Sequence, residues 1–168
     1  MSNVDKIENL IKSEYGNSSD LVFRKLKIKN HHILYVYLES VSSDDKISDF
    51  LMKDLSNYNK PIFKNIFESL QNSIYNSHLS IETKLEDIYV KLGSGFTIIF
   101  VDKYDKAISI ETKATLDRGV MESTSENAIR GPKDSFTENN SINLGLIRKR
   151  IKDKNLWFKE LYIGKYTQ

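Results

Sequence analysis

Histidine and cysteine are the residues that most often ligate metals or act as nucleophiles. The three histidines of this chain lack the spacing that such chemistry needs. His31 and His32 are adjacent, and neighbouring side chains of an extended segment diverge, so the two are poorly placed to ligate one metal ion. The third histidine, His78, has no helical partner at ligand spacing. Cysteine is absent, which excludes disulfides, thiol catalysis and thiolate zinc sites. We expect no metal site and no cofactor.

The glycines and carboxylates that resemble catalytic motifs are better explained as turns. Gly93-Ser94-Gly95 follows a predicted helix and precedes a predicted strand, which is the reverse of the order in a phosphate-binding loop. Asp102 and Asp105 flank a predicted hairpin tip, where carboxylates accept hydrogen bonds from nearby backbone amides. No Gly-x-Ser-x-Gly elbow is present. The sequence therefore predicts a protein that is not an enzyme.

The sharpest chemical feature is a basic run at the end of a predicted helix, where five of the seven residues 148–154 are Lys or Arg. Cations at a helix C-terminus are favoured by the macrodipole by about 0.3–1 kcal/mol each, so a solvated helix end is the simplest interpretation. The same run would also attract lipid headgroups, an acidic protein face or nucleic acid. Trp157, Phe158 and Tyr162 follow, and such aromatics either stack on bases or, more often, belong to a core or interface.

Composition indicates one soluble globular unit. The chain has 168 residues, 39% of them hydrophobic and 29% charged, with 25 basic against 23 acidic side chains. This balance does not predict a polyanion-binding surface, and we expect no nucleic-acid partner. The longest apolar run, residues 33–38, is far shorter than the roughly 20 residues that cross a bilayer. The N-terminus leads into an amphipathic segment without a secretory h-region, so we expect the chain to start in the cytosol and not to span a membrane.

Helical apolar spacing predicts four helices before residue 95. The first begins near Val4 and ends before Gly16. Two others begin at Ser42 and Thr83, which have the spacing of a capping box, and one begins near Pro61, a proline suited to the first turn of a helix. Their apolar positions span residues 47–55, 62–74 and 85–92.

Strand patterns alternate with these helices. Residues 21–29 and 33–38 predict one hairpin, and residues 96–101 and 107–111 predict another. The segment between strands 33–38 and 96–101 is long enough for a crossover, which would be right-handed if these strands are parallel. We expect an α/β fold with a mixed sheet of about four strands and helices packed on it.

The last third of the chain predicts a linker and an extension. The expected organisation is a first α/β subdomain over 1–112, a polar linker over 113–134, and a helix and strand over 135–168 that open a second, truncated subdomain. The helix begins at the capping pair Ser135 and Glu138, and residues 156–163 follow as a strand. These two elements are too few for a core of their own, so they either pack on the first unit or belong to a part absent from this chain.

Several runs of residues together resemble a known family. They are Val36-Tyr37-Leu38-Glu39-Ser40, the stretch from Phe100-Val101-Asp102 through Ile108-Ser109-Ile110-Glu111-Thr112, Arg130-Gly131-Pro132-Lys133-Asp134-Ser135-Phe136-Thr137-Glu138, Asn143, Leu146-Ile147-Arg148-Lys149-Arg150-Ile151 and Ile163-Gly164. In this order, and over nearly the whole chain, they resemble the family of A subunits of GerA-type spore germinant receptors.

This resemblance implies a soluble α/β N-terminal region of two subdomains that precedes a membrane-embedded portion. The chain would hold the first subdomain and the opening of the second. The implied partners are the receptor B and C subunits, the membrane portion of the same receptor chain, and a small-molecule germinant such as an amino acid, sugar or nucleoside. The implied location is the cytosolic face of the spore inner membrane, and no enzymatic step is implied.

The resembling run also supplies candidate linker and interface residues. Arg130-Gly131-Pro132 combines a long cation, a permissive residue and a fixed φ, which suits an irregular crossing between subdomains. We expect Arg130 to pair with a carboxylate or with helix-end carbonyls, and Arg148 and Arg150 to face another part of the receptor or the membrane surface. The candidate set is Arg130, Gly131, Pro132, Phe136, Glu138, Asn143, Arg148 and Arg150.

The function favoured by these observations is a non-catalytic module for receptor assembly and germinant signal transduction during spore germination. One alternative is a small-molecule-binding α/β domain, because α/β units often place ligands at the carboxyl ends of strands. A less favoured alternative is a nucleic-acid-binding module that uses the basic helix end, whose binding would weaken steeply with added salt.

Overall fold

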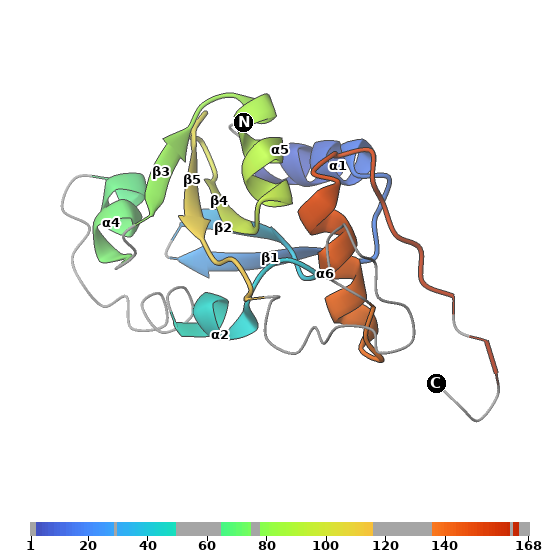
Figure 1. Ribbon diagram of the computed structural model, residues 1–168. Helices are drawn as coiled ribbons and strands as arrows, with labels where there is room; N and C mark the ends of the chain where they lie inside the picture. The colour runs from blue at the N-terminus through green and yellow to red at the C-terminus, as the bar shows by residue number, and fades with distance from the viewer. Residues whose placement is uncertain are drawn as a thin grey trace.

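The computed structural model describes residues 3–28, 30–49, 65–74, 78–115, 136–161 and 163–164. These residues form an antiparallel sheet with helices on both faces and a further helix at one end (Figure 1). The α/β class expected from the sequence is confirmed. None of the described helices is both long and apolar enough to cross a membrane.

The sheet has five strands in the order β1-β2-β4-β5-β3. The strands are β1 (Leu21–Ile28), β2 (His31–Leu38), β3 (Leu79–Glu82), β4 (Phe96–Val101) and β5 (Ala107–Glu111). Both predicted hairpins form, β1 with β2 and β4 with β5, and all four strand pairs are antiparallel. The central strands β2 and β4 also pair antiparallel, so the rule for a right-handed parallel crossover does not apply to them.

The sheet therefore has one strand more than the sequence predicted. That strand, β3, has only four residues, Leu-Ser-Ile-Glu, and it pairs with β5 at the edge of the sheet. A run this short has too little alternation to stand out from a loop, and its strand conformation depends on the neighbouring strand.

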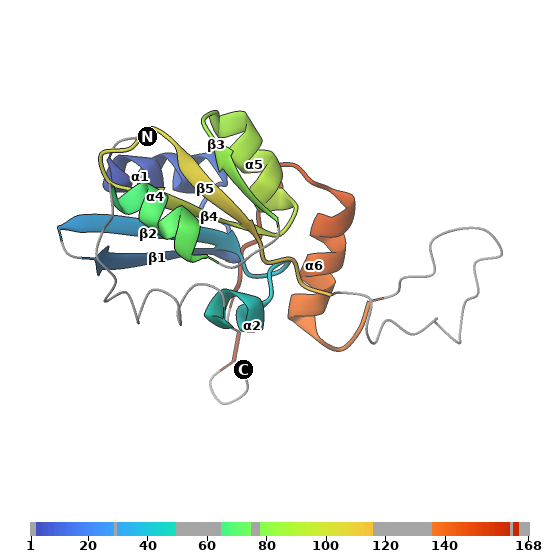
Figure 2. The same cartoon turned by 90° about the vertical axis from the view of Figure 1, so that its left-hand side faces the viewer.

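The described helices are α1 (Val4–Glu14), α2 (Asp44–Ile47), α4 (Ile66–Ser73), α5 (Leu85–Gly93) and α6 (Asn140–Arg150). α1 and α5 cover one face of the sheet, and α4 covers the other, where it lies in front of the strands in Figure 2. The predicted helix positions over residues 50–64, Pro61 among them, lie outside the described residues, as do residues 116–134 of the expected linker and Ser135, where the last helix was expected to begin.

Two apolar clusters fill these faces, because buried side chains of β2 and β4 alternate between them. Leu34 and Val36 of β2 and Ile98 of β4 pack with α1 and α5, whereas Tyr35 of β2 and Ile99 of β4 pack with α4. The continuous apolar runs in β2 and β4 thus come from burial on both faces, as the sequence predicted.

The helix starts differ from the predicted capping positions. Ser43 caps α2 through its side chain, whereas Ser42 pairs with Lys113 in an isolated β-bridge. α5 begins after Lys84 with no side-chain cap, and Thr83 is not its N-cap. α6 begins after Asn139, whose side chain accepts hydrogen bonds from the backbone amides of the first turn. Ser and Thr at capping spacing therefore marked these helices only to within a few residues.

The predicted strand over residues 156–163 is wrong for the part of it that the structure describes. Residues 156–161 are not assigned to a strand, and they follow α6 as a trailing segment (Figure 1). The backbone N–H and C=O of Phe158 form hydrogen bonds with Ser18 and Ser19, which precede β1. These bonds take the place of pairing with a neighbouring strand.

Candidate functional site at the junction of α6 and β1

The most unusual chemical group in the described structure is a buried arginine near the end of α6. Arg148 is only 1% exposed, although it stands in the basic run that the sequence assigned to a solvated helix end. Arg148 therefore packs inside the described structure, where it faces neither solvent nor a membrane surface. Burial of a cation is costly unless the group is paired and hydrogen-bonded, so its partners decide its role.

Asp20, the residue before β1, is that partner. Arg148 donates from Nε to Asp20 Oδ2 at 2.6 Å and from Nη2 to Asp20 Oδ1 at 2.8 Å. This is a two-pronged pairing of a planar guanidinium with a carboxylate, the geometry that gives arginine its specificity. Asp20 is itself only 4% exposed, so solvent hardly screens the pair.

Two serines complete the hydrogen bonding around Asp20. The Ser18 hydroxyl donates to Asp20 Oδ1 at 2.7 Å and accepts from Arg148 Nη2 at 3.1 Å. The Ser40 hydroxyl, just beyond β2, donates to Asp20 Oδ2. Burial by itself would raise the pKa of Asp20, but the hydrogen bonds from Arg148 and Ser40 and the charge of Arg148 outweigh it, so the pKa is lowered. The carboxylate is thus held in its charged form.

The trailing segment after α6 closes over this pair. The Phe158 ring lies 4.8 Å from the guanidinium carbon of Arg148, a cation–π contact. Its backbone N–H donates to Ser18 Oγ at 2.8 Å, and its carbonyl accepts from the Ser19 N–H at 2.9 Å. Phe158 was expected to stack on a base or to belong to a core or interface, and the structure places it in an interface within the chain.

Further contacts extend the junction along α1 and α5. Trp157 lies against Gly16, where an added Cβ would come within 2.4 Å of the indole ring. Lys154 forms an ion pair with Glu14 and lies 5.2 Å from the ring centre of Tyr89. Tyr89 also accepts a hydrogen bond at its carbonyl from the buried hydroxyl of Tyr15. The segment from α6 to Phe158 therefore packs on the first unit.

Asn143 fastens the beginning of α6. Its Oδ1 accepts from the Thr137 N–H at 2.7 Å, and its Nδ2 donates to the Thr137 carbonyl at 2.7 Å. This pair of bonds folds residues 137–139 back onto the first turn of the helix. Asn143 thus stabilises the start of α6 through hydrogen bonds to a residue six positions earlier.

The remaining candidate residues have varied surroundings. Arg130, Gly131 and Pro132 lie outside the described residues. Phe136 is 68% exposed and lies ahead of α6. Glu138 and Arg150 are also exposed. On α6 the buried residues are Gly145, Leu146 and Arg148, whereas the apolar Ile151 that follows the helix is 50% exposed.

Ser18, Asp20 and Ser40 are the site residues that the sequence did not reveal. A Ser-Ser-Asp run ahead of a strand is ordinary turn composition. Arg148 stands at the beginning of the basic run, where the helix macrodipole already explains a cation. Only the hydrogen bond between Arg148 and Asp20, which are 128 residues apart in the sequence, identifies these residues as a site. In the described ranges no group of three or more His, Asp or Glu side chains gathers in a way that would hold a metal ion.

Comparison with known proteins gives a consistent result. The family model of the Bacillus/Clostridium GerA spore germination protein matches residues 9–168. The chain is 29% identical over 163 residues to spore germination protein KA of Bacillus subtilis, covering 93% of the chain and 29% of that protein. It is 31% identical over 138 residues to spore germination protein XA of Bacillus anthracis, covering 81% of the chain and 28% of that protein. The chain thus spans less than a third of the length of these relatives.

A solved structure shares the fold. It is the crystal structure of the N-terminal domain of the A subunit of the Bacillus megaterium spore germinant receptor GerK3, with a TM-score of 0.72 and 27% sequence identity. The match covers 99% of this chain and 61% of that one. The family model, which takes in nearly all of the sequence, decides the assignment: the chain belongs to the GerA family of spore germination proteins.

Proposed function

We propose that this chain is a non-catalytic part of the A subunit of a spore germinant receptor, and that it contributes to receptor assembly and to transmission of the germinant signal. The observation that carries the proposal is the buried Arg148–Asp20 pair, which joins α6 to the sheet unit. A buried, geometrically specific pair fixes one arrangement of two elements more than it stabilises them. Such a joint suits a domain that must hold or change the relative position of two parts.

We also propose that the chain is divided into two subdomains joined by a linker. Residues 1–112 would form the first subdomain, 113–134 the linker, and 135–168 the opening of the second. The solved relative supports this division, since the chain covers 61% of it and the remainder would supply the rest of the second subdomain. In this view the Arg148–Asp20 pair is a contact between subdomains.

The partners and the location follow from the same proposal. The chain would work with receptor B and C subunits and with the membrane portion of its own receptor chain, at the cytosolic face of the spore inner membrane. Support comes from the relatives, which are spore germination proteins, and from the solved structure, which is a domain of a receptor of this kind. The exposed apolar residues Leu161 and Ile163, 71% and 86% exposed, lie where further chain or a partner would cover them.

The test uses spores that carry the gene with Arg148→Met, a change that keeps length and removes the charge. Arg150→Met is the matched control, because it removes an exposed arginine of the same helix. We expect Arg148→Met to lower the amount of receptor in spore membranes on immunoblots and to slow germination, measured as the fall in optical density after germinant addition. Normal receptor amount with normal germination in Arg148→Met spores would contradict the proposal.

A second candidate function, small-molecule binding, is favoured by one observation. A cavity of about 690 Å³ lies beside β1 and β2, and the Tyr35 side chain that helps to line it has a buried hydroxyl with no hydrogen-bond partner among the residues that the structure describes. Arg24 and Glu39 also line this cavity, so both charge signs are present. Saturation-transfer NMR with amino acids, sugars and nucleosides on the 168-residue chain, repeated with Tyr35→Phe, would test it. Equal signals in both proteins would contradict binding at this hydroxyl.

The nucleic-acid alternative loses support from the structure. Arg148 leaves the basic surface for the interior, and Phe158 packs on that arginine instead of lying open to a base. The basic run therefore offers a nucleic acid one cation fewer, and the aromatic residues after it offer one ring fewer, than the sequence alone indicated.

A further inference from the structure

A hollow of about 340 Å³ lies where the end of α6 meets the sheet unit. Three lysines line it, and they come from two parts of the chain: Lys113 follows β5, whereas Lys149 and Lys152 belong to the end of α6 and the residues after it. Ser94 and Gly93 at the end of α5 also form its wall. Among the described residues that line the hollow there is no Asp or Glu.

The wall formed by the sheet unit is a fixed piece of backbone. The Ala114 N–H donates to the Val41 carbonyl at 2.9 Å, and the Thr112 N–H donates to the Gly95 carbonyl at 3.2 Å. Gly95 has a φ of +84°, and a Cβ there would lie 2.7 Å from the Val41 carbonyl oxygen. These close contacts hold the backbone of Lys113, so its side chain projects from a defined position.

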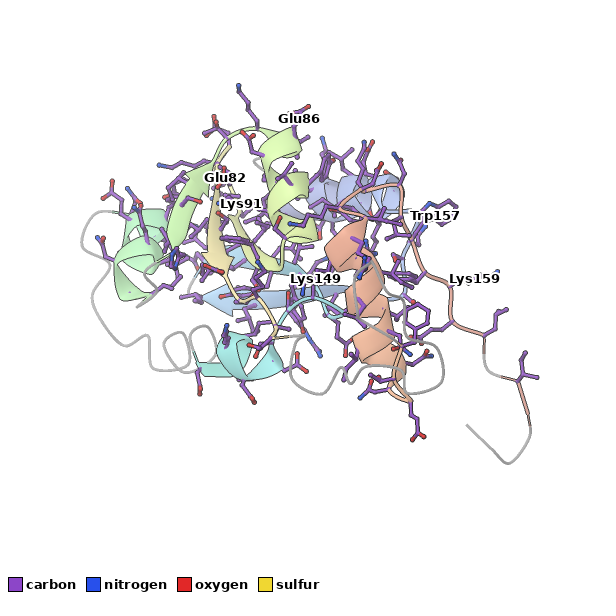
Figure 3. All side chains as sticks on the ribbon, viewed as in Figure 1. Glu82, Glu86, Lys91, Lys149, Trp157 and Lys159 are labelled. Atoms are coloured by element: carbon purple, nitrogen blue, oxygen red, sulfur yellow. The ribbon has the colours of Figure 1, made fainter. Side chains whose placement is uncertain are left out.

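The residues just after α6 lie close to the end of α5. A Cβ added to Gly93 would lie 4.0 Å from both Cα and Cβ of Lys152, which is an ordinary packing distance. Figure 3 shows Lys149 on the side of α6 that faces the sheet unit, whereas Lys159 lies farther along the trailing segment. Because Lys149 has interactions within the chain as well, Lys113 and Lys152 are the main candidate ligands of an anion.

Helix ends alone do not account for this concentration of lysines. α5 and α6 both end at the hollow, and each C-terminus carries roughly half a negative charge. Together they supply about one negative charge, against the two positive charges of Lys113 and Lys152 even when Lys149 is left out of the count. The lining therefore keeps a positive potential that favours an anion.

The type of cation narrows the class of anion. Arginine presents a planar fork that matches a flat carboxylate, whereas lysine acts as a point charge and is a common ligand of phosphate. The hollow is lined by lysines from two separate parts of the chain and by Ser94, with no arginine among its described lining residues. Ammonium groups that approach from different directions suit a tetrahedral oxyanion.

We propose that this hollow binds a small anion of the phosphate class, held by Lys113 and Ser94 on one side and by Lys149 and Lys152 on the other. The bound anion would contact both the sheet unit and α6, and would therefore stabilise their docked arrangement by mass action. The inference requires only the observed position of α6, and it stands whether or not the proposed receptor role is correct.

The test is calorimetric titration of the 168-residue chain with inorganic phosphate at about pH 7.5, with sodium chloride keeping the ionic strength constant. We expect saturable binding that weakens at least about fivefold in Lys113→Gln and in Lys152→Gln, because each change removes one charged hydrogen bond. Lys159→Gln, an exposed lysine outside the hollow, is the matched control and should bind as the unaltered chain does. The emission of Trp157 reports whether each variant keeps its docked tail.

Three outcomes would overturn the proposal. One is the absence of saturable phosphate binding to the unaltered chain. Another is an equal loss of affinity in Lys113→Gln, Lys152→Gln and Lys159→Gln, which would indicate general electrostatic attraction. The third is malonate binding as tightly as phosphate, which would remove the preference for a tetrahedral anion.

Discussion

The guanidinium of Arg148 and the carboxylate of Asp20 are 128 residues apart in sequence and form two hydrogen bonds of 2.6 and 2.8 Å in the protein interior. Ser18 bonds to both partners, and Ser40 bonds to the carboxylate. The polar groups of this junction are thus paired with one another, which is the condition under which a buried ion pair is tolerated.

Removal of one partner should be strongly destabilising. Arg148→Met leaves the Asp20 carboxylate buried without its cation, and we expect a loss of about 3–5 kcal/mol in the free energy of unfolding. Urea denaturation followed by circular dichroism would measure it. Arg150→Met, on the exposed side of the same helix, should change stability by no more than about 1 kcal/mol, because interactions of an exposed cation contribute little. A similar small change in both variants would show that the pair does not hold the fold.

The acid dependence of stability should follow the lowered pKa of Asp20. The ordinary pKa is 3.8, and the folded value lies below it. Between these two values the unfolded chain binds more protons than the folded chain, so stability rises with pH there. Stability from this group is therefore fully present above the ordinary pKa and is lost as the pH falls through the folded pKa. Urea midpoints from about pH 2 to 6 should show a shallower acid slope for Asp20→Asn than for the unaltered chain.

Gly16→Ala should displace the indole of Trp157. Gly16 has a φ of +55°, which is unfavourable for alanine, and the new Cβ would lie within 2.4 Å of the ring. Trp157 is the single tryptophan of the chain, so its fluorescence reports this contact directly. We expect a red-shifted emission and stronger acrylamide quenching. Gly93→Ala is the control, since its Cβ would meet only ordinary contacts at 4.0 Å, and the same spectral change there would count against the assignment.

Asn143→Ala should loosen the start of α6. The substitution removes both hydrogen bonds to the backbone of Thr137, and we expect faster hydrogen exchange of the amides in the first turn of α6, by about fivefold or more. Asn143→Asp keeps the acceptor oxygen and loses only the donor, so its effect should be intermediate. Exchange measured by NMR separates the first turn from the last turn around Ile147, which should not change.

The strands that could be predicted are those whose burial leaves a strong local signal. The apolar runs of β2 and β4 are buried on both faces, and the hairpin partners β1 and β5 precede or follow them within a few residues. In contrast, β3 carries four residues and acquires its conformation from β5. The register of β3 is set by its pairing with β5, so a short stretch of sequence around β3 cannot predict it.

The candidate site was harder to predict because its parts are separated in the chain. A cation at a helix end has a sufficient local explanation, so nothing adjacent to Arg148 indicates that it is buried. The buried face of α6 also contains Gly145 and this arginine, which a search for apolar spacing passes over. Asn143 was identified only through the resemblance, and its partner Thr137 is visible only in the fold.

The separation between Asp20 and Arg148 has a consequence for synthesis. A chain made from its N-terminus exposes the aspartate to the ribosome surface and to water long before the arginine has been added. The five strands, all of which end by Glu111, can pair during that interval. Docking of α6 therefore comes after synthesis of the described strands, and a nascent chain stalled before residue 148 would lack the cation that pairs with Asp20.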